Sequence, residues 1–182
     1  MKIKDKVVAW YIKNYLITRS QIIDKPGFVI FKMSHKTDIY SRQVVMPESL
    51  FVSVEKEIVK AYNNNGKQVL YSIGKKFGYR FANITHVVRL KETSEKSFLD
   101  YVFALSKFVE GTYASNIVST TNLKEKMIKF ELDNFVICRK SGLGYIITVG
   151  GIAGIWSFML DDHTIEAVQP KCQGRGDEEC LV

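Results

Sequence analysis

Apolar residues repeat every three or four positions through the middle of the chain, roughly from residue 50 to residue 109, and β-rich segments lie on either side. The three- and four-residue spacing is typical of amphipathic helices. Strands at both ends of a helical middle do not match the repeated strand-helix-strand order of a parallel sheet. We therefore expect an α+β fold in which a mainly antiparallel sheet packs with about four to five helices.

The expected elements follow from these periods. Helices are predicted over 5–17, 48–62, 69–82 and 95–109, with Gly66 as a left-handed cap after the second and Gly111 as the end of the fourth. Strands are predicted over 28–33 and 39–45, which form a hairpin, and over 128–138, 145–149 and 164–168, with a short helix over 150–160.

Three small residues share one face of the helix predicted over 69–82. Gly74, Gly78 and Ala82 are four positions apart, and each glycine weakens an exposed helix by about 1 kcal/mol relative to alanine. Close approach of another helix would compensate for that cost, and so would a ligand lying along a flat groove. We favour the helix and keep the ligand as the alternative.

Composition excludes several classes of protein. The 182 residues carry a net charge of +7, but the basic residues are scattered among acidic ones, which argues against nucleic-acid binding by this domain. The longest apolar stretch, Tyr145 to Leu160, is shorter than the ~20 residues that span a bilayer. The N-terminus carries no secretory signal pattern. We expect a cytoplasmic protein without a membrane span, and its lysine and isoleucine content resembles that of thermophilic, archaeal-like sequences.

No catalytic signature occurs in the sequence: a nucleophile elbow, a phosphate-binding loop and a zinc-protease motif are all missing, and the three histidines are far apart. We therefore expect a domain without catalysis of its own. Two cysteines, Cys172 and Cys180, enclose a glycine-rich turn near the C-terminus. Their spacing is compatible with a metal site, a disulfide or two buried thiols.

The pattern Cys172-x-Gly-x-Gly176-Asp177-x-x-Cys180 resembles the C-terminal signature of the 4-vinyl reductase domain family. Residues 42–50 and the helix over 69–78 resemble two further family segments in the same order, so that the likeness covers about residues 40–182. The resemblance implies the fold of heme-nitric-oxide sensors and of Golgi transport tethering subunits. It also implies binding of a small hydrophobic molecule, a regulatory role and a homodimer. We expect one domain over 1–182, with residues 1–40 forming an N-terminal helix and hairpin that lead into the family-like region.

The resemblance also suggests zinc, which similar family members bind through both signature cysteines, a carboxylate and an upstream cysteine. Here Gln169 occupies the carboxylate position, and no cysteine lies between residues 139 and 171. Only Cys138 or Glu166 could complete a site with Cys172 and Cys180. Because zinc prefers four ligands, we predict substoichiometric zinc.

An apolar pocket is the expected binding site. Its candidate lining residues are aromatic, with His86 or Tyr145 as a polar anchor: Phe77, Phe81, His86, Phe103, Tyr145 and Trp156. The leading hypothesis is a ligand-binding sensor or carrier domain. The alternatives are a tethering subunit that acts through its dimer surface, and an accessory protein of vinyl-group reduction in pigment synthesis.

Overall fold

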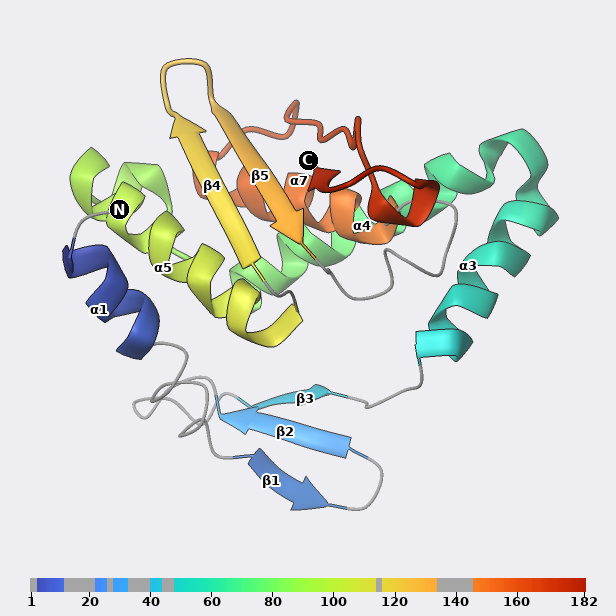
Figure 1. Ribbon diagram of the computed structural model, residues 1–182, viewed down its shortest axis with the longest axis horizontal. Coiled ribbons are helices and arrows are strands. Elements are labelled where there is room, and N and C mark those ends of the chain that lie inside the picture. The colour runs from blue at the N-terminus through green and yellow to red at the C-terminus, as the bar shows by residue number, and fades with distance from the viewer. Residues whose placement is uncertain are drawn as a thin grey trace.

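The computed structural model describes residues 3–11, 22–25, 28–32, 40–43, 48–113, 116–133 and 146–182. The helices are α1 (Ile3–Tyr11), α3 (Glu48–Tyr62), α4 (Gly66–Ile84), α5 (Glu95–Tyr113) and α7 (Ile146–Leu160). The strands are β1 (Ile22–Lys25), β2 (Phe28–Lys32), β3 (Tyr40–Gln43), β4 (Asn116–Asn122), β5 (Met127–Asp133) and β6 (Cys180–Leu181). Figure 1 shows these elements in an α+β arrangement dominated by helices, which confirms the predicted fold class.

The strands form two small sheets, ordered β1-β2-β3 and β4-β5-β6, and the neighbouring strands within each sheet are antiparallel. The predicted hairpin over 28–33 and 39–45 is confirmed, because Lys32 pairs with Tyr40. β1 and β4 were not predicted. β4 is rich in serine, threonine and asparagine, so its sequence lacks a clear apolar alternation.

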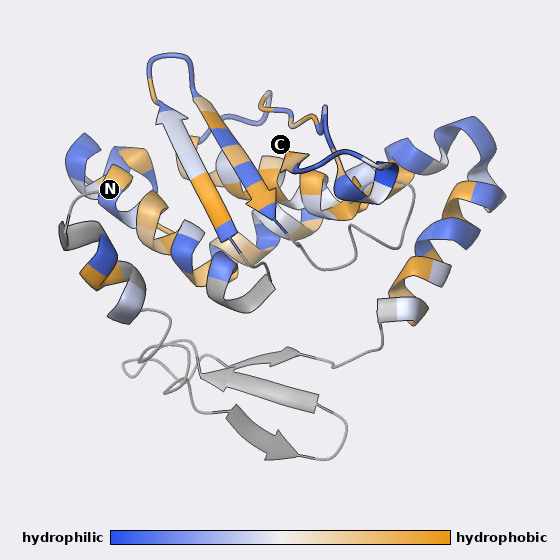
Figure 2. Ribbon diagram, viewed as in Figure 1, coloured by the Kyte–Doolittle hydropathy of each residue, from blue (hydrophilic) through white to orange (hydrophobic). Residues whose placement is uncertain are grey.

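Helices α4 and α7 pack side by side, and the second sheet packs on α5 and α7. Figure 2 shows hydrophobic and hydrophilic residues alternating along β5, as expected for a strand with one face buried. By contrast, α7 is apolar around most of its circumference, and more than half of its residues are buried. A helix of this composition belongs in the core rather than on the surface.

The structure corrects the prediction of a strand over 145–149. Ile146 to Val149 form the first turn of α7, and Tyr145 lies outside the described residues. The run of β-branched residues favours a strand locally, but burial of the whole segment against α4 stabilises a helix instead.

The predicted strand over 164–168 is also wrong, because this segment has no regular secondary structure. Its backbone is held by side chains: the Tyr71 hydroxyl accepts a hydrogen bond from the Ala167 N–H at 2.8 Å, and Asp162 Oδ1 accepts one from the Thr164 N–H at 3.0 Å. The third strand of the second sheet is instead β6, which pairs with β5 through Leu132 and Cys180.

Two predicted helix ends also differ. Gly66 has helical backbone angles and begins α4, while Asn63 takes the left-handed conformation with φ of 47°. Asparagine tolerates this conformation better than most residues. Gly111 does not end α5, which continues to Tyr113.

Candidate functional site

The contact between α4 and α7 depends on glycines from both helices. A Cβ built on Gly78 would lie 2.1 Å from the carbonyl oxygen of Gly151, and one on Gly154 would lie 2.1 Å from that of Lys75. A Cβ on Gly74 would lie 2.0 Å from the carbonyl oxygen of Ile147, and one on Gly150 would lie 2.2 Å from that of Tyr71. The small-residue face of α4 is therefore covered by a helix of the same chain, which confirms the packing explanation of its spacing.

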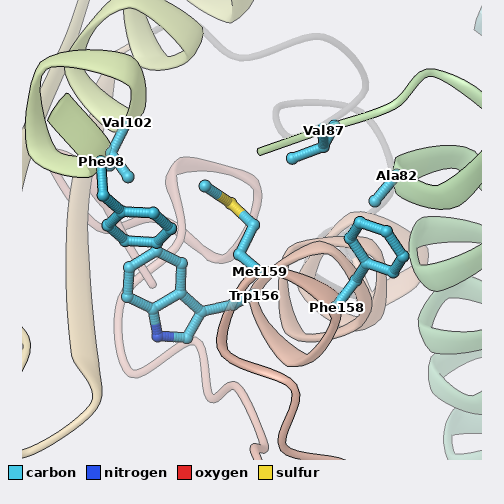
Figure 3. Close-up of a cluster of buried hydrophobic side chains, with 7 residues drawn as sticks. All are labelled: Ala82, Val87, Phe98, Val102, Trp156, Phe158 and Met159. Carbon is cyan, nitrogen blue, oxygen red and sulfur yellow. The ribbon is translucent and has the colours of Figure 1, made fainter. Parts of the chain in front are cut away.

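Aromatic and aliphatic side chains fill the space between α4, α5 and α7. Phe98 and Trp156 are in ring contact, with centroids 5.9 Å apart, and Figure 3 shows them with five neighbours: Ala82, Val87, Val102, Phe158 and Met159. The Trp156 Nε1–H donates a hydrogen bond to the carbonyl oxygen of Lys126 at 2.8 Å, which joins α7 to the second sheet. Trp156 is thus a core residue whose polar atom is already satisfied.

The predicted ligand-binding residues that the structure describes lie in different surroundings, and Tyr145 is not among the described residues. Phe77 is 63% exposed and stacks on half-buried Phe81 at 5.9 Å, so the expectation that this pair faces inward is wrong for Phe77. The glycine face of α4 contacts α7, and Phe77 and Phe81 therefore lie off that face. His86 is exposed and has a φ of 53°, whereas Phe103 is half-buried and lies outside both core clusters.

A buried carboxyl group on α3 was not predicted from the sequence. Glu55 is 1% exposed, and neither of its side-chain oxygens has a hydrogen-bond partner among the described residues. Burial raises the pKa of Glu55 to about 7; the backbone N–H of Ile147, at the start of α7, acts in the opposite direction without forming a hydrogen bond of good geometry. A polar group that is buried without a partner costs free energy, and positions of this kind are often functional.

A second polar feature is a surface hollow of about 290 Å³ between α4 and α7. We call it the basic hollow, because three of its lining residues are Lys75, Lys76 and Arg80. Ser157 also lines it, and its buried side-chain oxygen has no hydrogen-bond partner in the part of the chain that the structure describes. The hollow combines positive charge with an unsatisfied hydroxyl group.

Beside this hollow, Glu166 connects the C-terminal segment to α4. Its carboxylate accepts hydrogen bonds from Lys75 Nζ at 2.6 Å and from the Tyr71 hydroxyl at 2.5 Å. Burial raises the pKa of Glu166, but these two bonds outweigh it and hold the pKa below its ordinary value. Burial, together with the negative charge of Glu166, raises the pKa of Tyr71 to about 12. Glu166 is therefore an ionised structural partner of α4.

Cys172 and Cys180 are fully buried in one apolar cluster with Ile117 and Leu132 of the second sheet, and no disulfide joins them. Among the described residues, no three histidine, cysteine, aspartate or glutamate side chains come together in a group that could hold a metal ion. Of the two further ligands considered, Cys138 lies outside the described residues, and Glu166 is bonded to Lys75 and Tyr71. The glycine-rich turn between the cysteines is closed by Asp177, which accepts a hydrogen bond from the Cys172 N–H at 2.6 Å.

Within the segments that the structure describes, no helix is long and apolar enough to cross a membrane.

The chain resembles known proteins in structure but not in sequence. No family model matches the chain, and no curated protein matches it. Among solved structures, the crystal structure of the phenol-responsive sensory domain of the transcription activator PoxR with phenol matches with a TM-score of 0.65. The two chains are 15% identical, and the match covers 100% of this chain and 89% of the other. The chain therefore shares the fold of that domain.

Proposed function

We propose that this chain is a small-molecule-binding sensor domain with a regulatory role. The fold likeness to a phenol-responsive sensory domain carries the proposal, because it extends over the whole chain. It agrees with the resemblance to the 4-vinyl reductase domain family, and we propose membership of that family or of a close relative. A sensor needs no catalytic group.

The ligand that we propose is a small hydrophobic molecule with at least one polar atom. Glu55 is the best candidate for the group that orients it, because its carboxyl group is buried, lacks a hydrogen-bond partner and has a pKa of about 7. In its protonated form the carboxyl group donates one hydrogen bond and accepts others, so it can pair with a hydroxyl group. The ligand would lie between the inner face of α3 and the first turn of α7. Tyr145 precedes that turn in the sequence and remains a candidate for its wall.

The test is a thermal-shift series on the purified chain with phenol, catechol, toluene, benzoate and octanoate. A ligand at one hundred times its Kd stabilises the folded state by about 2.7 kcal/mol, which corresponds to roughly 5 to 10 °C for a domain of this size. We expect a phenol to give such a shift, and Glu55→Gln to reduce it more than Glu57→Gln, an exposed carboxylate on the same helix. If no compound changes the melting temperature at saturating concentration, the sensor proposal fails.

A second candidate is an interaction module, and the exposed face of α4 favours it. Ile73, Phe77 and Ile84 are about half exposed or more and lie close together on the helical wheel, which leaves a mainly apolar stripe on the surface. Exposed Arg80 lies on the same face and interrupts the stripe. Contiguous apolar stripes of a few hundred Å² often mark protein interfaces. Since α7 covers the glycine face of α4, that face is not free for a homodimer, and the interaction module that we propose would use this stripe.

Light scattering distinguishes a homodimer from a monomer. A homodimer formed through the stripe should give twice the monomer mass at micromolar concentration, and Phe77→Glu should return it to the monomer mass. A monomeric wild-type chain that still binds phenol would leave the sensor proposal intact and contradict the interaction module.

A further inference from the structure

The basic hollow has a role that the proposed sensor function does not explain. It lies between α4 and α7, has a volume of about 290 Å³, and includes the rings of Tyr79 and His163 in its wall. These two rings are 4.9 Å apart between centroids. The hollow is therefore large enough for a small molecule, and one side of it is aromatic.

Charge in the hollow is only partly compensated. Lys75 is paired with Glu166 at 2.6 Å and also donates a hydrogen bond to the carbonyl oxygen of His163 at 3.3 Å. Lys76 and Arg80 are exposed, lie one turn apart on α4, and form no ion pair with any residue that the structure describes. Two positive charges thus remain after the Lys75 pair is counted.

Ser157 supplies a second, independent observation. It is 1% exposed, lines the same hollow, and its hydroxyl group has no hydrogen-bond partner within the described segments. A serine inside a helix usually donates to the carbonyl oxygen four residues earlier. Ser53 and Ser106 do so in this protein, both at 2.9 Å. Ser157 does not, so its hydroxyl group keeps an unused donor beside the hollow that it lines.

We propose that the basic hollow binds the phosphate group of a small phosphorylated molecule. A phosphate monoester carries a charge of about −1.5 to −2 at neutral pH and three terminal acceptor oxygens. The uncompensated charges of Lys76 and Arg80 match that charge, and those two side chains and the Ser157 hydroxyl offer donors for the three oxygens. A single carboxylate would leave one of the two cations unpaired. The ring pair of Tyr79 and His163 would face the organic part of the ligand.

This site is separate from the proposed ligand position at Glu55, so either can fail without the other. The phosphate site uses α4 and α7 residues at the basic hollow, whereas the sensor site uses the inner face of α3. A phenol titration and a phosphate titration of the same protein therefore give independent results.

The experiment is a calorimetric titration of the full chain with inorganic phosphate at about pH 8, where the dianion dominates, and with sodium chloride at matched ionic strength. We expect saturable binding of phosphate and none of chloride. Arg80→Ala and Lys76→Ala should each weaken phosphate binding about tenfold, because each removes a charge-assisted hydrogen bond. Lys67→Ala, which removes an equal charge from an exposed position on the same helix, should leave the affinity unchanged.

Ser157→Ala distinguishes a binding role from a structural one. Because the hydroxyl group has no partner in the unliganded protein, its removal should leave the melting temperature unchanged or slightly higher. The same variant should weaken phosphate binding several-fold.

Three results would overturn the proposal. They are equal heats from phosphate and chloride, equal losses in Lys67→Ala and Arg80→Ala, and unchanged phosphate affinity in Ser157→Ala. The same variants are also titrated with a short DNA duplex and with vesicles of phosphatidylserine and phosphatidylcholine. Binding to either of these without binding to inorganic phosphate would assign the basic residues to a polymer or membrane surface and contradict a small-molecule site.

Discussion

Replacing Gly78 by alanine tests the close contact between α4 and α7. The added Cβ would lie 2.1 Å from the carbonyl oxygen of Gly151 and 2.8 Å from its carbonyl carbon, whereas ordinary contacts lie at 3.4 to 4 Å. The obstacle is backbone, so it cannot move aside as a flexible side chain would. The two helices must separate by roughly 1 Å at this point, which disturbs a well-packed core.

The expected cost follows from two opposing effects. Forcing extra atoms into a packed core typically costs about 1 to 3 kcal/mol, and more where the backbone must move. Alanine gains up to about 1 kcal/mol over glycine in helix propensity. We expect Gly78→Ala to lower the free energy of unfolding by about 2 kcal/mol and the melting temperature by roughly 4 to 8 °C.

Gly151 provides the matched control. It is in the facing helix, but a Cβ there would have a single neighbour, the carbonyl oxygen of Gly74, at an ordinary distance of 3.9 Å. Gly151→Ala should therefore keep or slightly raise the stability. Urea denaturation followed by circular dichroism measures both variants. If Gly78→Ala proves as stable as Gly151→Ala, α4 and α7 do not approach each other as described.

The remaining predictions concern buried polar groups. Glu55 titrates near 7 when folded and near 4.5 when unfolded, so the wild-type protein should lose stability as the pH rises from 4.5 through 7. Glu55→Gln lacks this loss, so its free energy of unfolding should exceed that of the wild type by about 3 kcal/mol at about pH 8 and by nothing at about pH 4. Exposed Glu57→Gln should show no such trend. A stability gain in Glu55→Gln that does not vary with pH would contradict the assignment. Buried Glu110 pairs with Lys107 and accepts a hydrogen bond from the Ile117 N–H, so Glu110→Ala should lower the free energy of unfolding by about 3 kcal/mol in urea denaturation, because it removes the counter-charge of Lys107 and the acceptor of that N–H. A loss under about 1 kcal/mol would mean that this ion pair is solvated. Elemental analysis should find substoichiometric zinc, and a chelator should leave the melting temperature unchanged. Stoichiometric zinc would show that Cys172 and Cys180 acquire further ligands.

Periodicity predicted the helices α3 and α4 because their apolar residues repeat at helical spacing over several turns. The spacing of Gly74, Gly78 and Ala82 also predicted a close helix contact, since few other features require small residues every four positions. The partner of that face could not be predicted: Ile146 to Val149 carry a local preference for a strand, and only burial against α4 makes them helical.

The candidate sites were harder to predict for a physical reason. Phe77 was placed in a pocket because aromatic residues are usually buried, but the glycine face occupies the inner side of its helix. Glu55 and Ser157 gave no sequence signal, because an isolated polar residue in a helix is most often exposed. Their importance depends on burial without a partner, which requires three-dimensional contacts.

Hydrogen–deuterium exchange of the full chain, with and without the compound that gives the largest thermal shift, tests the sensor proposal most directly. The probe is phenol if no compound gives a shift. If the sensor proposal is correct, we expect slower exchange in α3 around Glu55 and in the turn of α7 around Val149, because a ligand held between them would stabilise both segments against opening. Unchanged exchange throughout the chain at saturating phenol, or protection confined to the outer face of α4 around Phe77, would contradict an internal small-molecule site.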